Sequence, residues 1–297
     1  MSQEAYHGTS DLTSGCSPAL GTGQTLAATT RLVAAPDQYR FEGEDLGDWF
    51  AAQIQAQIDD MNANGIKFAG FLADSIFSSD GVIPNPIGFL KKAVDVVHAN
   101  GGIFIADEVQ PGFARTGDSF WGFGRHGVVP DIITTGKPMG NGIPVSGLLA
   151  KDHVLSAFSQ KIPYFNTFGG NPVAMAAAQA VLKTIQEEEL QAHSQRLGGL
   201  LLTELRKLME KYDCVGDVRG AGLFIGFELV QDRFTKMPDK ALALDLIEEL
   251  RNTHRVLTSV AGPYGNVLKL RPPLVFQEKD IDWLVGALDQ ALSKLQK

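Results

Sequence analysis

The sequence has few of the features that mark secreted, membrane-bound or nucleic-acid-binding proteins. Only two cysteines occur among its 297 residues, Cys16 and Cys214, and two distant cysteines do not make a disulfide framework. The first twenty residues lack both the basic and the apolar part of a signal peptide. No apolar run approaches the roughly 18 residues that span a bilayer. We therefore predict a cytoplasmic protein without a membrane partner.

Positive charge is also scarce. The chain has 26 Lys and Arg residues against 34 Asp and Glu, a formal net charge of -8, and no basic run exceeds a pair. Binding to nucleic acid needs a basic patch or stripe, so the composition argues against that partner. The six histidines show no paired spacing and no Cys-x-x-Cys is present, so we predict no metal site.

Apolar periodicity indicates an α/β protein in the first part of the chain. Apolar residues at fourfold spacing over 46–61 predict a helix that ends before Gly65, and Pro86 is expected to open a second helix that stops near Asn100. The predicted strands are 68–73, 102–106, 132–135 and 145–150. Alternation of strands and helices is typical of a mostly parallel sheet.

The second part of the chain has a different order of predicted helices and strands. A long Ala-rich helix is predicted from Pro172, with 187–189 as a solvated face within it. Strands at 222–230 and 267–270 and helices at 240–253 and 280–295 then indicate a smaller α+β region. We therefore place a large domain at residues 1–188 and a small C-terminal domain at 189–297.

Two segments at the ends of predicted strands carry candidate chemistry. The segment 107–110 (Asp-Glu-Val-Gln) follows a strand directly, and open α/β sheets place their ligands at the carboxyl ends of strands. The segment 135–142 sets Lys137 among apolar residues, prolines and glycines. Taken singly, Asp107 can equally be a helix cap and Lys137 a solvated charge. The P-loop and dinucleotide-binding patterns are both incomplete, which argues against a nucleotide-binding protein.

Four motifs, in this order and spacing, resemble those of the class III aminotransferases, also called ω-aminotransferases. They are 107–110 (Asp-Glu-Val-Gln), 130–133 (Pro-Asp-Ile-Ile), 136–142 (Gly-Lys-Pro-Met-Gly-Asn-Gly) and 166–172 (Asn-Thr-Phe-Gly-Gly-Asn-Pro). The segments 218–223 and 271–274 match the smaller C-terminal domain of that family. The resemblance implies a pyridoxal-phosphate (PLP) enzyme whose large domain has the type I fold.

The resemblance also assigns roles to residues of the large domain. Lys137 is implied to form the Schiff base with the cofactor aldehyde and to shuttle a proton, as a lysine in a desolvated pocket does well. Asp107 is implied to keep the ring nitrogen protonated, which makes the ring an electron sink. Val109 is expected to pack on one ring face, and Gln110 to bond the phenolic oxygen of the ring.

Further residues follow from the same resemblance. The motif Tyr6, His7 and Gly8 corresponds to the family's Tyr-His-Gly, whose aromatic ring stacks on the other face of the cofactor. Thr167 is expected to reach the cofactor phosphate of a neighbouring subunit, so a homodimer is implied. Arg271 suits a substrate carboxylate as a bidentate clamp. A structural arginine at a strand end is the alternative interpretation.

Two departures from the family pattern leave the reaction open. The family has a long segment before its Tyr-His-Gly motif, with a loop that holds the cofactor phosphate, so we expect an N-terminally truncated large domain and weak cofactor binding. In addition, 73–75 (Ala-Asp-Ser) stands where ordinary members have Ala-Glu-Pro, whose glutamate often gates a substrate-binding arginine. With 78–81 (Ser-Ser-Asp-Gly), this segment resembles a subgroup that contains phospho-lyases.

The expected function is that of a transferase. We predict amino-group transfer from an amine or ω-amino acid to a 2-oxo acid through a Schiff base on Lys137. One alternative is a PLP-dependent phospho-lyase that acts on a phosphorylated amino alcohol or amino acid. The other alternative is a non-catalytic fragment that retains the fold and the dimer surface.

Overall fold

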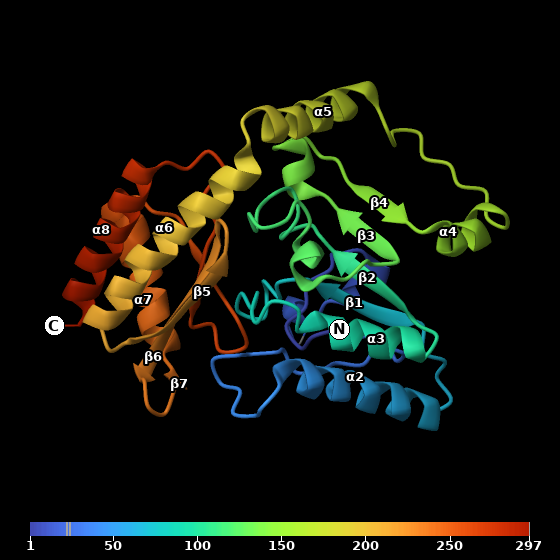
Figure 1. Ribbon diagram of the computed structural model, residues 1–297, viewed down its shortest axis with the longest axis horizontal. Coiled ribbons are helices and arrows are strands. Elements are labelled where there is room, and N and C mark those ends of the chain that lie inside the picture. Colours follow the sequence, from blue (N-terminus) through green and yellow to red (C-terminus); the bar gives the residue numbers. More distant parts are fainter. Residues whose placement is uncertain (22, 24, 297) are drawn as a thin grey trace.

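The computed structural model describes residues 1–21, 23 and 25–296, and the chain forms two sheets with helices packed on them (Figure 1). The first sheet has the order β1-β2-β3-β4. Its strands are β1 (Gly70–Asp74), β2 (Ile103–Asp107), β3 (Ile132–Thr135) and β4 (Gly147–Ala150). Strands β1, β2 and β3 are parallel to one another, which confirms the predicted mostly parallel sheet.

Strand β4 runs antiparallel to β3. The sequence pattern did not distinguish this orientation from a parallel one. The connection between the two strands holds only a short 3-10 helix, η3 (Lys137–Gly140), whereas a parallel return needs a crossover of a dozen or more residues. The loop that carries Lys137 is therefore the turn at which the chain reverses direction.

Two helices cover the first sheet, and they bury a core rich in aromatic residues. Helix α2 (Leu46–Ala63) begins at its N-cap Asp45, whose side chain accepts a hydrogen bond from the amide of Asp48. Helix α3 (Leu90–Ala99) begins four residues later than the sequence predicted, because Gly88 has φ +90 and a left-handed residue interrupts the helix. The core contains Phe50, Phe71, Phe77, Phe89 and Phe104.

The second sheet is antiparallel and has the order β5-β6-β9-β8. Its strands are β5 (Val215–Ala221), β6 (Phe224–Asp232), β8 (Ser259–Ala261) and β9 (Val267–Leu270), and β7 (Met237–Pro238) pairs with β6. Helices α6 (Leu190–Lys211), α7 (Lys240–His254) and α8 (Glu278–Leu295) pack on it (Figure 1). Strand β5 was missed in the sequence, where the predicted strand began at Gly222. Gly222 has φ +51 and lies in the tight turn between β5 and β6.

The predicted Ala-rich helix is two helices. Helix α5 (Pro172–Glu187) ends before Glu188, and Glu189 adopts a left-handed conformation with φ 49 before α6 begins. Residues 188–189 therefore form the break between the two helices. The residues 187–189 are exposed, as expected, but they do not lie within one helix. The apolar cluster of the first sheet contains residues up to Val128, and that of the second sheet begins at Leu197. The boundary between domains at residue 188 stays a prediction.

The remaining helical segments are short: α1 (Asp11–Ser14), α4 (Asp152–Ser159), η1 (Pro18–Leu20) and η2 (Gly122–His126). Helix α4 and the segment after it project from the body of the molecule before the chain returns to α5 (Figure 1). None of the described helices combines the length and the apolar character that crossing a membrane requires.

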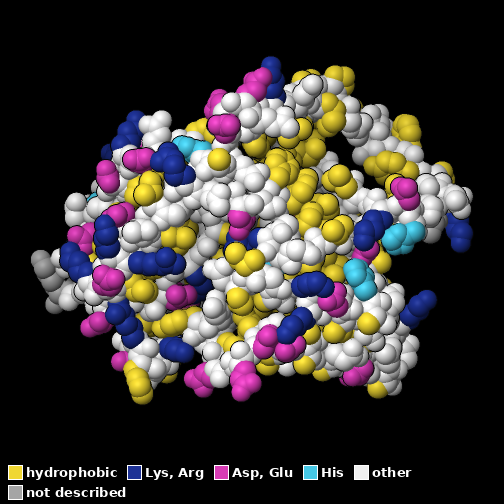
Figure 2. Space-filling model, viewed as in Figure 1, with side chains coloured by type: hydrophobic (Ala, Val, Ile, Leu, Met, Phe, Trp, Pro, Cys, Tyr) yellow, Lys and Arg dark blue, Asp and Glu magenta, His cyan; other side chains and the backbone are white. Residues whose placement is uncertain are grey.

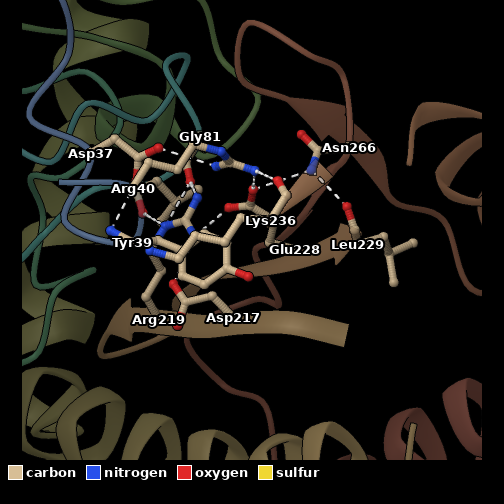
Figure 3. A network of polar contacts seen from close by, with 11 residues as sticks. Asp37, Tyr39, Arg40, Gly81, Asp217, Arg219, Glu228, Leu229, Lys236 and Asn266 are labelled. Atoms are coloured by element: carbon tan, nitrogen blue, oxygen red, sulfur yellow. Dashed lines mark hydrogen bonds and ion pairs between the residues drawn. The ribbon is translucent and has the colours of Figure 1, made fainter. Parts of the chain in front are cut away.

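A buried ion-pair network joins the second sheet to the loop after β1 (Figure 3). Arg219 of β5 donates to the carboxylate of Glu228 at 2.6 Å, and its other nitrogens donate to the carbonyls of Gly81 at 2.7 Å and Val82 at 2.8 Å. Arg40 pairs with the second oxygen of Glu228 at 2.5 Å. Burial alone would raise the pKa of Glu228, but the charges of Arg219 and Arg40 lower it. The network fixes the loop 78–82 against the second sheet.

Two adjacent glycines in α6 provide a matched test of helix packing. A Cβ at Gly198 would overlap the carbonyl oxygen of Gly222, a backbone atom that no side-chain rotation can move away. A Cβ at Gly199 would meet nothing within 4 Å. We expect Gly198→Ala to lower the free energy of unfolding by about 1 to 3 kcal/mol. Gly199→Ala is expected to raise it by up to about 1 kcal/mol through helix propensity. Urea denaturation measures the free energy of unfolding of both variants. Equal effects would contradict the packing of α6 against the turn between β5 and β6.

Candidate functional site

A pocket of about 210 Å³ lies where β1 and β2 end. Asp74 and Asp107, the last residues of these two strands, are register partners and both line the pocket. The other lining residues are Tyr6, His7, Gly8, Val109, Gln110 and Lys137. The structure thus brings together every residue that the sequence assigned to the cofactor, apart from Thr167. Their individual roles stay predictions.

The carboxylate of Asp107 is held on both oxygens. His7 Nδ1 lies 2.7 Å from Asp107 Oδ2, and the amide of Val109 donates to Oδ1 at 3.1 Å. The side chains of His7 and Asp107 are only 4% and 11% exposed. His7 Nε2 is buried and has no hydrogen-bond partner among the described residues. This geometry orients Asp107 at the pocket wall and leaves one buried ring nitrogen free there.

The N-terminal segment that carries Tyr6 and His7 is anchored by another buried acid. Asp80 accepts hydrogen bonds from the Ser2 hydroxyl at 2.7 Å and from the Glu4 amide at 3.0 Å. Burial raises the pKa of Asp80 to about 7. Because Asp80 lies in the loop after β1, this segment and the strand end are fixed to each other.

Lys137 follows β3 and lines the pocket. Its Nζ lies 5.5 Å from the centroid of the Tyr6 ring. The residue has φ 34, a left-handed conformation that is uncommon for a side chain other than glycine and is frequent at functional sites. The sequence analysis expected a desolvated lysine, but Lys137 is exposed. It also borders a second, wider hollow of about 1350 Å³ between β4 and the segment 164–175.

Two further acids beside Asp107, the half-buried Asp74 and the buried Glu108, are hydrogen-bonded to neighbouring loops. Asp74 accepts from the amides of Ile76 and Ser78, each at 3.0 Å, and from the Ser78 hydroxyl. Glu108 accepts from the Ser75 hydroxyl at 2.7 Å and from the amides of Gly122 and Phe123. Burial raises the pKa of Asp74, and it raises the pKa of Glu108 to about 7. These two acids organise the loops around the pocket.

Arg271 lies just after β9 and contacts Gln110, a lining residue of the pocket. Its Nη1 donates to Gln110 Oε1 at 3.0 Å, and its guanidinium carbon lies 5.8 Å from the centroid of the Phe224 ring. Gln110 Nε2 in turn donates to the Ser78 hydroxyl at 2.6 Å. The predicted substrate arginine and a predicted cofactor residue are therefore in direct contact.

Sequence reasoning missed Lys269, a half-buried lysine on β9. With Tyr6, Gln110 and Lys137 it lines a hollow of about 390 Å³. Burial, followed by the charges of Arg271 and Lys137, lowers the pKa of Lys269 to about 8. The available signal was a lysine inside the apolar strand 267–270. That signal is weak, because a lysine on the exposed face of a strand gives the same pattern.

Thr167 lies apart from the pocket of its own chain. It is exposed, in the turn between α4 and α5, and it does not line the pocket around Asp107. Its neighbours Tyr164, Phe165 and Phe168 are 73%, 85% and 79% exposed. Figure 2 shows further apolar side chains gathered beneath α5 and over β4. The expected contact of Thr167 with a neighbouring subunit stays a prediction.

Comparison with known proteins defines the family. The profile of the family described as Aminotransferase class-III matches residues 1–292, so the chain belongs to the class III aminotransferases. Enzymes of this family depend on PLP. This confirms the resemblance stated from the motifs and the expected type I fold.

Particular relatives differ in the reaction that their names state. A Drosophila melanogaster protein named alanine–glyoxylate aminotransferase 2-like is 44% identical over 82% of this chain and 49% of its own length. Ethanolamine-phosphate phospho-lyase homolog 1 of Caenorhabditis elegans is 40% identical over 84% of this chain and 54% of its own length. A solved phospholyase from Arthrobacter, in complex with phosphoethanolamine, superposes with a TM-score of 0.93 and 37% identity, covering 98% of this chain and 70% of that one. The chain thus spans about half the length of the curated relatives it matches.

The residues of the pocket fit the cofactor of the family. An amine, a carboxylate held on both oxygens and an aromatic ring line one cavity, contributed by Lys137, Asp107 and Tyr6. PLP requires these groups for covalent attachment, for its ring nitrogen and for stacking. His7, which also lines this pocket, has a buried Nε2 without a hydrogen-bond partner among the described residues.

Proposed function

We propose that the chain uses PLP to transfer an amino group from an amine or ω-amino acid to a 2-oxo acid. The observation that carries this proposal is the placement of Lys137 and Asp107 in one pocket with Tyr6. When bound, PLP supplies an electron sink for the reacting carbon of the substrate. Lys137 attaches the cofactor through Nζ and afterwards carries a proton at the same atom. Asp107, oriented by His7, stabilises the protonated ring nitrogen.

Recognition of the 2-oxo acid is assigned to Arg271. A guanidinium binds a carboxylate through two parallel hydrogen bonds. Within the described part of the chain Arg271 has no carboxylate partner, and its polar contact is the neutral amide of Gln110. Its charge is therefore available to an anionic substrate.

A second candidate reaction is the elimination of phosphate from a phosphorylated amine. It is favoured by three cationic side chains near one another, because the charges of Arg271 and Lys137 both act on Lys269. A phosphate carries close to two negative charges at neutral pH and so matches such a cluster better than a single carboxylate does. The names of two of the relatives above refer to this activity.

We also propose that the chain forms a homodimer through the surface around Thr167. The neighbouring Tyr164, Phe165 and Phe168 are exposed, and a stable monomer rarely exposes such a contiguous apolar patch. Burial of these rings against a second copy would remove them from water.

The cytoplasmic location stays a prediction, since some relatives are named as mitochondrial.

The first test traps the cofactor on the protein. Borohydride reduction of the PLP-loaded chain, followed by peptide mapping, is expected to find the pyridoxyl group on Lys137. Lys269 is the internal control, because it lines the neighbouring hollow together with Lys137 and its pKa is lowered to about 8. A label on Lys269 would contradict the assignment of Lys137, and no label at all would support the non-catalytic fragment.

The second test separates the two reactions by their products. The chain is incubated with PLP, phosphoethanolamine and a 2-oxo acid, and new amino acid, ammonia and inorganic phosphate are measured. Transamination yields amino acid in proportion to the 2-oxo acid consumed and no phosphate. Release of phosphate with ammonia, independent of the 2-oxo acid, would replace our first proposal by the second.

The same assay checks the pH dependence of anion recognition. Lys269, with a pKa near 8, is charged below that pH and neutral above it, so the KM of the anionic substrate is expected to rise as pH increases through 8. Lys269→Met is expected to raise KM about tenfold at pH 7, equivalent to one charge-assisted hydrogen bond. It should also remove the pH dependence. A KM that is independent of pH in the unmodified chain would exclude Lys269 from substrate recognition.

Light scattering tests the dimer. The chain has a mass of 32.0 kDa, and we expect twice that value in solution. Replacing Phe165 and Phe168 by Ser is expected to shift the mass to that of the monomer. Phe234→Ser is the matched control, because Phe234 is 93% exposed in the hairpin between β6 and β7, far along the chain from this surface. An unmodified chain that is monomeric at all concentrations would contradict the proposal.

A further inference from the structure

A continuous chain of hydrogen bonds runs from the half-buried carboxylate of Asp74 to the exposed guanidinium of Arg271. The hydroxyl of Ser78 donates to Asp74 Oδ2. Gln110 Nε2 donates to the same hydroxyl oxygen at 2.6 Å. Arg271 Nη1 donates to Gln110 Oε1 at 3.0 Å. Four residues from three separate parts of the chain are thus linked in series.

The direction of each bond in this chain is determined by the carboxylate. In its carboxylate form Asp74 accepts hydrogen bonds only, so the single proton of the Ser78 hydroxyl is committed to it. The Ser78 oxygen can then only accept a further hydrogen bond, so it binds the amide nitrogen of Gln110 and not the amide oxygen. The carbonyl oxygen of Gln110 therefore faces Arg271 and accepts its hydrogen bond. With the amide reversed, an NH₂ group would face the guanidinium and repel it.

Ser78 is well placed to exert this control. Its side chain is fully buried, so water does not compete for the hydroxyl. Its own backbone is fixed, because its amide also donates to Asp74 at 3.0 Å. Its carbonyl oxygen lies 3.4 Å from Lys269 Nζ. One residue therefore contacts Lys269 through its backbone and reaches Arg271 through its hydroxyl.

We propose that Ser78 is a positioning residue that orients the Gln110 amide and thereby fixes Arg271 for an anionic group of the substrate. The inference rests on the proposed function, because the anion belongs to the substrate of that site. It also explains why Asp74 is not paired with Arg271 directly. The acid is connected to the guanidinium through a neutral serine and a neutral amide, so the positive charge of Arg271 remains uncompensated.

The chemistry of the arrangement admits either a carboxylate or a phosphate. Both offer oxygens that accept from a guanidinium in parallel pairs. The experiment therefore uses two probes, acetate and inorganic phosphate, in separate titrations. A preference for one of them identifies the anion that the site binds.

The test measures anion binding without turnover. The PLP-loaded chain is reduced with borohydride, which stops the reaction, and is titrated with each probe by calorimetry. We expect Ser78→Ala to raise the Kd of the preferred anion about tenfold, as expected for the loss of one hydrogen bond to a charged group. Ser75→Ala is the matched control, since Ser75 is also buried and donates to a buried carboxylate, Glu108, but has no connection to Arg271. It should leave the Kd unchanged.

A double-mutant cycle shows whether Ser78 acts through Arg271. Arg271→Gln should weaken binding, and adding Ser78→Ala to it should have no further effect. Independent effects of the two substitutions, an unchanged Kd in Ser78→Ala, or no binding of either probe to the unmodified chain would each overturn the inference. Thermal denaturation of the Ser78→Ala and Ser75→Ala variants separates a loss of folding from a loss of positioning.

The two proposals fail in different ways. A pyridoxyl label absent from Lys137 contradicts the proposed function, whereas correct labelling with an unaltered Kd in Ser78→Ala contradicts only the role of Ser78. If the cofactor does not load, the same titrations on the unloaded chain test the link between Ser78 and Arg271.

Discussion

The pairing of the fully buried Glu228 with two arginines is the interaction on which the geometry of the site depends. Burial of a carboxylate lowers the stability of the fold by several kcal/mol unless the group is paired and hydrogen-bonded. Glu228 meets this requirement with Arg219 and Arg40. The other two nitrogens of Arg219 donate hydrogen bonds to the carbonyls of Gly81 and Val82. Neutralising one acid in the second sheet thus fixes the loop that follows β1 in the first sheet.

The pocket follows from this constraint. Ser78 and Asp80 lie in the fixed loop, so the Asp80 anchor for Ser2 and Glu4 is fixed as well. That anchor holds the segment on which Tyr6 and His7 approach Asp107. The net charge of the chain is -8, but Lys137 and Lys269 both line the hollow next to this pocket. The local arrangement, and not the net charge, therefore determines what the pocket attracts.

The sequence predicted features set by local pattern and missed those set by tertiary contacts. Strand β3 and strand β9 have the predicted bounds, and α2, α7 and α8 differ by a few residues, because their apolar periodicity is strong. The break at Glu189 and the turn at Gly222 depend on left-handed residues within sequences that otherwise favour one continuous element. Asp107 and Lys137 were found through short motifs. The segment 78–81 was noted only as a departure from the family pattern, and Lys269 was missed. The contact between Ser78 and Lys269 could not be predicted, because they are 191 positions apart and only folding brings them together.

The exposure of Lys137 connects the chemistry with the proposed assembly. A lysine is a good nucleophile only as the free amine, and desolvation favours that form by lowering the pKa. In the single chain, Lys137 borders the wide hollow that is also lined by Tyr164, Phe168 and Met175. These exposed apolar side chains are the ones that the proposed dimer would cover. A second copy seated there would close one of the hollows that Lys137 borders, so burial of the apolar surface and a smaller access of water to the lysine would be results of the same contact.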